Sequence, residues 1–315
     1  MISVKNMLCL FLNLLALSLS LDLNTIVNEV NTRSDVSWVA GRNPRFERMT
    51  RAQFRSMCGA RKTPESEKIY LPTKVLDNIP EEFDAIKEWP SCETIGTIYD
   101  QGHCGSCWAM ASFESLQDRF CIHSNGSMKP LLSGQHLTSC CPGSNGCNGG
   151  WQSKAFNFIK GNGITTEECI PYQMGTCKHP GCSMWKTPKC NRTCYPNTKI
   201  PVDKEKYYVR TYGNIARKEA AIQTEIMTNG PVTGSFTVYQ DFATYKSGVY
   251  HHVSGGYDGL HAIKIVGWGV QDGVKYWKVV NSWNTDWGMD GVFLIKRGNN
   301  ECGIEGDIVV ALPKI

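Results

Sequence analysis

The 315-residue sequence contains no run of Lys or Arg, and its 33 basic and 29 acidic residues leave a formal net charge of only +4. We therefore expect no nucleic-acid partner, because nucleic-acid-binding proteins carry clustered basic residues. Beyond the N-terminal region no apolar stretch reaches the roughly 20 residues that a bilayer span requires, so no membrane partner is expected either. Internal repeats and low-complexity tracts are also lacking, and 41% hydrophobic residues indicate a globular protein.

The N-terminus has the pattern of a secretory signal peptide. Lys5 supplies a positive charge, residues 8–19 are apolar, and Ser18 and Ser20 are the small residues that precede a cleavage site. A membrane anchor is the alternative, but the apolar stretch is too short to favour it. We predict that residues 1–20 are removed and that the chain enters the secretory pathway, to reach a lysosome-like acidic vesicle or the extracellular space.

The 15 cysteines fit an oxidising compartment, since so many are rare in cytosolic proteins unless they bind metal. Residues 21–78 hold only one of them after the predicted signal, Cys58, and combine ten basic with seven acidic residues and helix-compatible stretches. A basic segment of this kind ahead of a cysteine-rich body predicts a propeptide, with an N-terminal helical subdomain as the alternative. The mature protein is then expected to be residues 79–315.

The predicted mature region divides into two halves. Helix-like patterns cover residues 107–121 and 151–161, in a first half that ends near residue 200. Strand-like runs separated by glycine turns follow, at Pro231–Tyr239, His261–Gly267, Lys275–Asn281 and Gly291–Lys296. This order predicts an α+β fold with a mainly helical subdomain (about 79–200) and a mainly β subdomain (about 201–315). The cleft between two such halves is the expected place for an active site.

The most informative stretch runs from Asp100 to Ala109 and reads Asp-Gln-Gly-His-Cys-Gly-Ser-Cys-Trp-Ala. A glycine-rich turn leads into Cys107, and a helix is predicted to follow it. At a helix N-terminus the dipole favours the thiolate, which is the nucleophilic form. Cys104 and Cys107 also form Cys-x-x-Cys, which occurs in redox pairs and zinc sites. Because no second Cys-x-x-Cys and no βαβ unit accompany it, we expect neither a metal nor a cofactor.

A cysteine nucleophile needs a base, and the base needs a group that orients it. His261 begins an apolar strand and Asn281 ends the next one, so adjacent strands can bring the two side chains together. A neutral amide can orient the imidazole without quenching the charge of an imidazolium. A lone histidine is more often a core residue, but the three motifs together favour catalysis.

These motifs resemble those of the papain-like cysteine proteases. The resemblance rests on Gln101, Cys104–Trp108, His261-Ala262 and Asn281–Trp283, which follow the family's order over residues 79–315. It implies a papain-like fold, helical in one half and β-barrel-like in the other. The implied roles are Cys107 as nucleophile, His261 as acid/base, Asn281 as orienter, Gln101 as oxyanion donor together with the Cys107 N–H, and Trp283 as a shield over the His–Asn pair.

Within that family the match is closest to the cathepsin B group, on Ile79–Trp89, Cys140-Cys141, Cys147–Trp151, Thr187–Cys190 and Cys302–Glu305. It implies that Gly149 and Gly150 pair with the substrate backbone. The pocket for the second residue upstream of the cut would be lined by Ser235, Leu260, Ala262 and Asp307. Leu260 replaces a glycine of the group and Asp307 a glutamate, so we expect apolar side chains to be preferred over Arg there. The implied partners are protein and peptide substrates, the propeptide as inhibitor and cystatin-like inhibitors, and a monomer is expected.

The resemblance also implies five disulfides: Cys92–Cys121, Cys104–Cys147, Cys140–Cys190, Cys169–Cys194 and Cys177–Cys182. Cys302 is expected to be free, and so is Cys141, because Pro142–Gly146 contains no cysteine to pair with it. Two sequons, at Asn125 and Asn191, are candidate glycosylation sites.

Cathepsin B carries an occluding loop whose adjacent histidines hold the C-terminal carboxylate of the substrate. Here the corresponding loop, Cys177–Cys182, is short. His179 matches the first histidine and is expected to pair with Asp100, whereas the second position is Pro180. We therefore predict mainly endopeptidase activity with weakened peptidyl-dipeptidase activity. The tandem His251-His252 lies outside this loop and is expected to be structural. The alternative function is an inactive homologue that acts as a secreted binding protein, which the intact catalytic positions disfavour.

Overall fold

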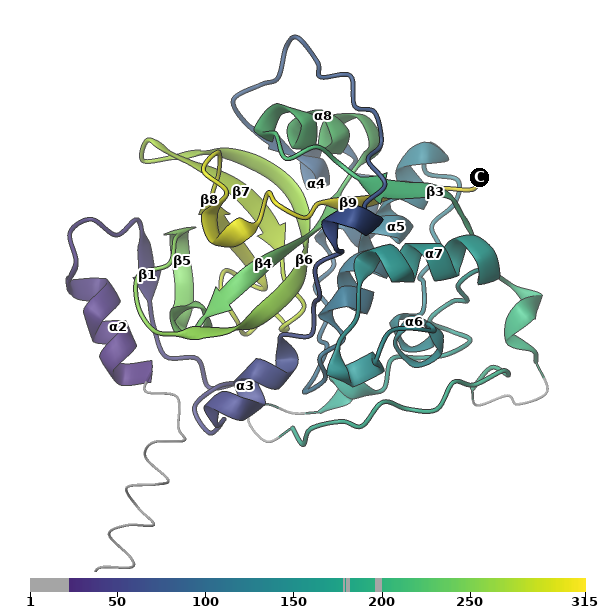
Figure 1. Cartoon of the computed structure of the whole chain (residues 1–315), viewed down its shortest axis with the longest axis horizontal. Coiled ribbons are helices and arrows are strands. Elements are labelled where there is room, and N and C mark those ends of the chain that lie inside the picture. The colour runs from purple at the N-terminus through teal and green to yellow at the C-terminus, as the bar shows by residue number, and fades with distance from the viewer. Residues whose placement is uncertain (1–22, 178, 180–181, 196–199) are drawn as a thin grey trace, which may run out of the picture.

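The computed structural model describes residues 23–177, 179, 182–195 and 200–315. The predicted signal peptide, Lys178 and Pro180 therefore lie outside the described residues. The chain forms a strand-rich half and a helical half that lie side by side, and the N-terminal segment (residues 23–78) passes along the first and then across their junction (Figure 1). Among the described residues no helix has the length and apolar character that a membrane crossing requires.

The N-terminal segment contributes α2 (Leu23–Thr32), β1 (Trp38–Ala40) and α3 (Arg51–Met57). Next come β2 (Phe83–Asp84), α4 (Ala85–Glu88), α5 (Cys107–His123), α6 (Gly134–Cys140) and α7 (Gln152–Asn162). The remaining elements are β3 (Val209–Asn214), α8 (Glu219–Asn229), β4 (Val232–Tyr239), β5 (Tyr245–Tyr250), β6 (Tyr257–Gln271), β7 (Val274–Val280), β8 (Val292–Lys296) and β9 (Val309–Pro313). Short 3-10 turns occupy Glu65–Glu67, Glu93–Gly96, Gly146–Asn148, Met174–Thr176, Val202–Lys204, Gln240–Thr244 and Glu301–Gly303.

The strands form one sheet in the order β1-β5-β8-β7-β6-β4-β9-β3, and β2 pairs separately with β6. Most neighbours are antiparallel, whereas β5 and β8 are parallel. Strand β1 of the N-terminal segment pairs with the edge strand β5, so this segment extends the sheet of the strand-rich half (Figure 1). The four strand runs expected from the sequence correspond to β4, β6, β7 and β8, while β3, β5, β9 and helix α8 were not anticipated.

Local sequence signals account for several element boundaries. Helix α3 begins with a capping box: the Thr50 hydroxyl accepts from the Gln53 N–H, and the Gln53 side chain accepts from the Thr50 N–H. Helix α7 is followed by Gly163, whose φ of 73° is readily adopted by glycine and ends the helix. Helix α5 is buried all the way from Cys107 to Cys121, so its polar and charged side chains are buried together with its apolar ones.

Helix α5 lies between the two halves and packs against β6. Lys264 of β6 is completely buried, and its Nζ lies 2.9 Å from Asp118 Oδ2 and 3.9 Å from Glu114 Oε2, both on α5. Burial raises the pKa values of both carboxyls, that of Glu114 to about 8, in spite of Lys264, and the shorter contact makes Asp118 the hydrogen-bond partner of Lys264. This buried pair ties the helix that begins at Cys107 to the strand that carries His261.

Replacing Lys264 with Ala should therefore destabilise the proenzyme by about 3–5 kcal/mol, because Asp118 would remain buried without its counter-charge. Urea denaturation at pH 7 with the disulfides intact would measure this change. The control is Lys296→Ala, at the exposed end of β8, which should change stability by no more than about 0.5 kcal/mol. A similar small effect for both variants would contradict the role given to the buried pair.

Candidate active site

Cys107 is the first residue of α5, where the glycine-rich turn ends and the helix begins. Its side chain is fully buried in a small apolar cluster with Ala60 of the N-terminal segment and with Leu260 and Ala262 of β6. Leu260 and Ala262 flank His261 in the chain. The start of helix α5 and this part of β6 thus meet around the thiol of Cys107.

His261 and Asn281 form a hydrogen-bonded pair. Nε2 of His261 lies 2.7 Å from Oδ1 of Asn281, which follows the last residue of β7. Because the amide oxygen accepts, Nε2 must carry the proton, and Nδ1 is left as the basic nitrogen. Nδ1 is buried and has no hydrogen-bond partner among the described residues. The buried ring of Trp283 lies 4.7 Å from the imidazole, between centroids, and covers it.

The side-chain amide of Gln101 is completely engaged. Its Nε2 donates to the carbonyl oxygens of Cys104, at 2.6 Å, and of Met57, at 2.9 Å. Its Oε1 accepts from the Ser282 hydroxyl at 2.7 Å. Met57 belongs to α3 of the N-terminal segment. The Met57 carbonyl therefore occupies Gln101 Nε2, the donor that the family resemblance implies for the oxyanion.

After α3 the N-terminal segment forms backbone hydrogen bonds with both halves. The Ala60 N–H donates to Leu260 O at 3.0 Å, and on the other side the Gly150 N–H donates to Gly59 O at 2.9 Å. These contacts form parallel bridges, and α3 itself lies at the junction of the halves (Figure 1). Gly149 has a φ of 104°, and a Cβ there would lie 2.6 Å from Gly59 O, so the close approach requires glycine.

Burial has opposite effects on the two members of the predicted catalytic pair. Both side chains are fully buried beneath the N-terminal segment. Burial raises the pKa of the Cys107 thiol to about 11 and lowers the pKa of the His261 imidazole to about 4. At neutral pH the pair is therefore an uncharged thiol and an uncharged imidazole in this form of the protein.

The predicted upstream pocket lies on the strand-rich side. Ser235 of β4 is the register partner of Ala262, and Leu260 is its neighbour on β6. The Asp307 carboxylate accepts from Asn214 Nδ2 at 3.2 Å and lies 3.4 Å from Lys68 Nζ of the N-terminal segment. The side chains of Lys68 and Asp307 are both buried in this form of the protein.

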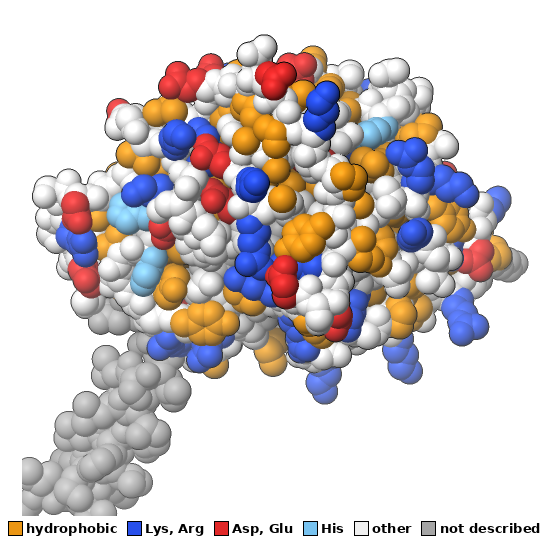
Figure 2. Space-filling view, turned by 45° about the horizontal axis from the view of Figure 1, so that its top comes forward, with side chains coloured by type: hydrophobic (Ala, Val, Ile, Leu, Met, Phe, Trp, Pro, Cys, Tyr) orange, Lys and Arg blue, Asp and Glu red, His pale blue; other side chains and the backbone are white. Residues whose placement is uncertain are grey.

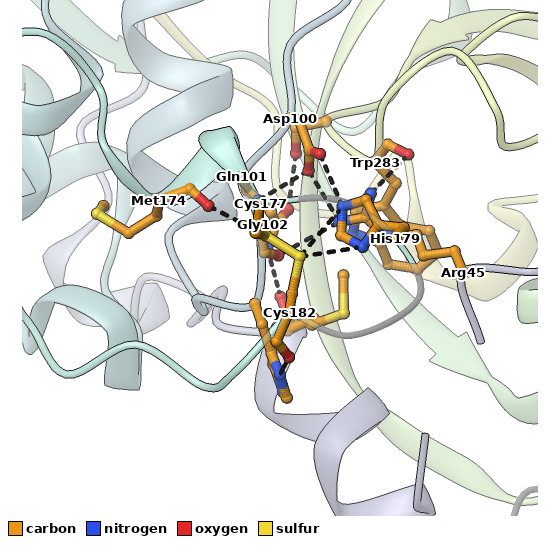
Figure 3. A network of polar contacts seen from close by, with 12 residues as sticks. Arg45, Asp100, Gln101, Gly102, Met174, Cys177, His179, Cys182 and Trp283 are labelled. Carbon is orange, nitrogen blue, oxygen red and sulfur yellow. Dashed lines mark hydrogen bonds and ion pairs between the residues drawn. A yellow bond between two sulfur atoms is a disulfide. The ribbon is translucent and has the colours of Figure 1, made fainter. Parts of the chain in front are cut away.

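At the opposite end, the side chains of His179 and Arg45 both contact the Asp100 carboxylate (Figure 3). His179 Nε2 lies 2.8 Å from Asp100 Oδ2, as expected, and Arg45 Nη2 of the N-terminal segment lies 2.8 Å from Oδ1. Arg45 also donates to the carbonyl oxygens of Trp283 and Gly102. Burial opposes ionisation, but the His179 hydrogen bond and the Arg45 charge hold the pKa of Asp100 below its ordinary value.

Sequence reasoning missed the part that His103 plays. Its Nδ1 lies 3.1 Å from Cys182 O, and its Nε2 lies 3.1 Å from Ser56 Oγ and 3.2 Å from Gln53 O. The buried ring thus connects the loop that ends at Cys182 to α3. The one feature of the sequence that could have indicated this role is the position of His103 between Gln101 and Cys107, within the catalytic motif. Arg45 was missed because nothing in a sequence marks which basic residue becomes buried.

The remaining predicted residues have clear positions. The structure contains the five disulfides that the resemblance implied, and among the described residues it leaves Cys58, Cys107, Cys141 and Cys302 unpaired. Cys177, His179 and Cys182 cluster as metal ligands would, but the disulfide removes both thiolates.

The two sequon residues, Asn125 and Asn191, are exposed. His252 stacks on Tyr239, and its Nδ1 lies 3.1 Å from Asp241 Oδ2.

Comparison with known proteins identifies the family of the chain. Residues 79–312 match the family model described as papain family cysteine protease. The chain belongs to the papain family. It is 40% identical to a cathepsin B-like cysteine proteinase of Schistosoma japonicum, over 92% of this chain and 90% of that protein. It is 43% identical to cathepsin B-like cysteine proteinase 5 of Caenorhabditis elegans, over 80% of each chain.

A solved structure, procathepsin B S9 from Trypanosoma congolense, superposes on this papain-family chain with a TM-score of 0.83 and 36% identity. The superposition covers 92% of this chain and 98% of the procathepsin B chain. The predicted α+β papain-like fold and the cathepsin B resemblance are thereby confirmed, and the protein is a cysteine peptidase of cathepsin B-like type.

Because Cys107 is an uncharged thiol in this form, we expect iodoacetamide to modify it slowly at pH 7. With a pKa of about 11, about one thiol in 10⁴ is ionised. Alkylation in the proenzyme should be at least about 100-fold slower than in the mature enzyme, and mass spectrometry of the Cys107 peptide would measure it. Using Cys58→Ser proenzyme keeps the neighbouring thiol from consuming reagent. Equal rates in the two forms would show that the N-terminal segment does not suppress the thiolate.

Proposed function

We propose that this cathepsin B-like zymogen is converted into a peptidase that cleaves peptide bonds with Cys107, His261 and Asn281. The observation that carries the proposal is the arrangement of His261. Its Nε2 is fixed by Asn281, and its basic Nδ1 is free on the strand that packs against Cys107. This leaves one nitrogen available to accept the thiol proton.

The chemistry follows from this arrangement. His261 accepts the proton of Cys107, and the thiolate attacks the substrate carbonyl carbon. Gln101 Nε2 and the Cys107 N–H stabilise the oxyanion that forms, and His261 then protonates the departing amine. Water, deprotonated by the same imidazole, hydrolyses the acyl-enzyme. Asn281 keeps the ring oriented, while Trp283 keeps water from competing for the His–Asn hydrogen bond.

The N-terminal segment acts as an inhibitory propeptide in this proposal. Met57 O occupies the oxyanion donor Gln101, and Gly59 and Ala60 take the backbone positions beside Gly150 and Leu260. Its removal hydrates Cys107 and His261, which permits the ion pair that catalysis requires. The processing site near residue 78 and cleavage after residue 20 remain predictions of the sequence, as do the secretory destination, cystatin-like inhibition and the monomeric state.

On the upstream side we expect apolar side chains to be preferred at the second residue before the cut. Leu260 narrows the pocket, and Asp307 is a short carboxylate that Asn214 already binds. Lys68 shows that a lysine amine reaches Asp307 in the zymogen, so basic side chains are disfavoured rather than excluded.

On the downstream side the short loop supports endopeptidase activity. His179 is held by Asp100, so one imidazole remains at this end, but the disulfide Cys177–Cys182 closes a loop with only four residues between its cysteines. A proline stands where cathepsin B has its second histidine, and proline offers neither an imidazole nor a backbone donor. We therefore propose that long peptides extend past this end and that peptidyl-dipeptidase activity is weak.

Cys107→Ala and His261→Ala should each abolish peptide hydrolysis, since nucleophile and base act as a unit. Asn281→Ala should cause a smaller loss, because it removes only the orientation of the ring. The kcat/KM of the mature enzymes on a peptide substrate would measure this order. The matched control is His252→Ala, which removes an imidazole that contacts Tyr239 and Asp241 and should retain activity. Substantial activity in purified Cys107→Ala enzyme would refute the assignment.

Two peptides that differ only at the C-terminus test the open downstream end. One has a free carboxylate two residues past the cut, and the other has that carboxylate amidated. Similar kcat/KM values are expected for the two, in wild-type enzyme and in His179→Ala, because the His179 imidazole is buried and already bound to Asp100. A large preference for the free carboxylate that is lost in His179→Ala would show that the short loop still performs exopeptidase recognition.

A further inference from the structure

The strand β6 carries a second carboxylate that the catalytic proposal does not use. Asp258 is three residues before His261, and its side chain is completely buried. Arg51 of α3 binds it: the guanidinium Nε lies 2.6 Å from Asp258 Oδ1, and Nη2 donates to Tyr257 O at 3.1 Å. A carboxylate and a backbone carbonyl therefore bind two nitrogen atoms of the same guanidinium.

Glycine leaves room for this guanidinium. A Cβ at Gly256 would lie 2.7 Å from Arg51 Nη2, so any larger residue would press on the bound group. The other oxygen, Asp258 Oδ2, is buried and accepts no hydrogen bond from any residue the structure describes. Arg51 thus leaves the second oxygen of the carboxylate without a hydrogen bond. A ligand with a differently placed guanidinium could donate to both oxygens.

A β-bulge aims Asp258 at the N-terminal segment. Val238 of β4 pairs with Gly259, and Tyr239 pairs with Tyr257, so Asp258 is the extra residue between two register pairs. A bulge breaks the alternation of side chains along a strand. Both Asp258 and Gly259 consequently face the segment, since a Cβ at Gly259 would lie 2.7 Å from the Cβ of Cys58.

The order of contacts along the N-terminal segment places this site downstream of the cut. Lys68 lies at Asp307, in the predicted upstream pocket, and Gly59 pairs with Gly150. Met57 O then reaches Gln101, where the reacting carbonyl is expected. Arg51 precedes Met57 in the segment, as does Arg45, which contacts Asp100 near the loop.

We propose that Asp258 and the Tyr257 carbonyl form a subsite for a basic side chain, preferentially Arg, on the residue directly downstream of the cleaved bond. This rests on the proposed peptidase function and adds a substrate preference to it. Three residues of strand separate Asp258 from His261 by about 10 Å. Across such a separation only a long side chain on the residue after the cut comes near Asp258, whereas a short one stays out of reach.

Removal of the N-terminal segment takes Arg51 away and leaves Asp258 at the surface of the junction. Hydration then favours the carboxylate, and an incoming guanidinium restores the contacts that Arg51 made. Arg fits better than Lys, because its planar group presents several donors to a carboxylate and a carbonyl at once.

The test uses two peptides that are identical except for Arg or citrulline directly after the cut. Citrulline keeps the length and shape of Arg but carries no charge. Mature wild-type enzyme should cleave the Arg peptide with a kcat/KM about tenfold higher, in keeping with a charge-assisted contact. The preference should shrink in 1 M salt, which screens a surface-accessible pair. Cleavage of both peptides at equal rates would overturn the subsite and leave the peptidase function standing, whereas cleavage of neither would overturn the peptidase function.

Variants then assign the preference to Asp258. Asp258→Asn should bring the Arg-to-citrulline ratio to about one, and Asp258→Glu should retain a preference for Arg. The matched control is Asp272→Asn, which removes an exposed carboxylate at the β6–β7 turn and should leave the ratio at its wild-type value. An unchanged ratio in Asp258→Asn would overturn the assignment. Should that variant fail to fold, the salt dependence of the wild-type ratio and the Asp258→Glu variant still decide.

Discussion

The contact between the start of helix α5 and strand β6 is the constraint on which the site depends. It brings Cys107 against the residues that flank His261, and the buried Lys264–Asp118 pair fixes the same helix to the same strand further along. Neither half of the fold contains the proposed catalytic pair by itself. The chemistry is therefore a property of the junction, and any change that moves α5 relative to β6 separates the thiol from its base.

The N-terminal segment exploits the same junction with three basic residues, each of which binds a different carboxylate. Arg45 pairs with Asp100, Arg51 with Asp258 and Lys68 with Asp307. On the face that Figure 2 shows, by contrast, charged side chains of both signs are interspersed with apolar ones. Three basic residues of the segment thus contact three separate carboxylates whose side chains are largely buried.

These three ion pairs do not respond to acid in the same way. The pKa of Asp100 is held below its ordinary value, so its contact persists until the pH falls through that lowered pKa, and acid then weakens it. Burial raises the pKa values of Asp258 and Asp307 despite Arg51 and Lys68. If release of the N-terminal segment returns the pKa values of Asp258 and Asp307 to their ordinary range, acid stabilises the form in which the segment is bound, at both carboxyls. Among the three ion pairs, only the one between Arg45 and Asp100 is therefore weakened by acid in a way that favours release of the N-terminal segment.

Local patterns in the sequence determined the fold class, helices α5 and α7, four central strands and the family resemblance that named the site residues. These features depend on periodicity and on short motifs, which survive without knowledge of neighbours. Only the tertiary structure decided that Met57 O reaches Gln101, that Arg45 and Arg51 are the basic residues that pair with Asp100 and Asp258, and that His103 joins α3 to the loop. Arg45 and Asp100 are 55 residues apart, and Arg51 and Asp258 are 207 apart. Such pairings are set by how the halves and the segment pack together, and a charged residue in the sequence carries no mark of the partner that burial will give it.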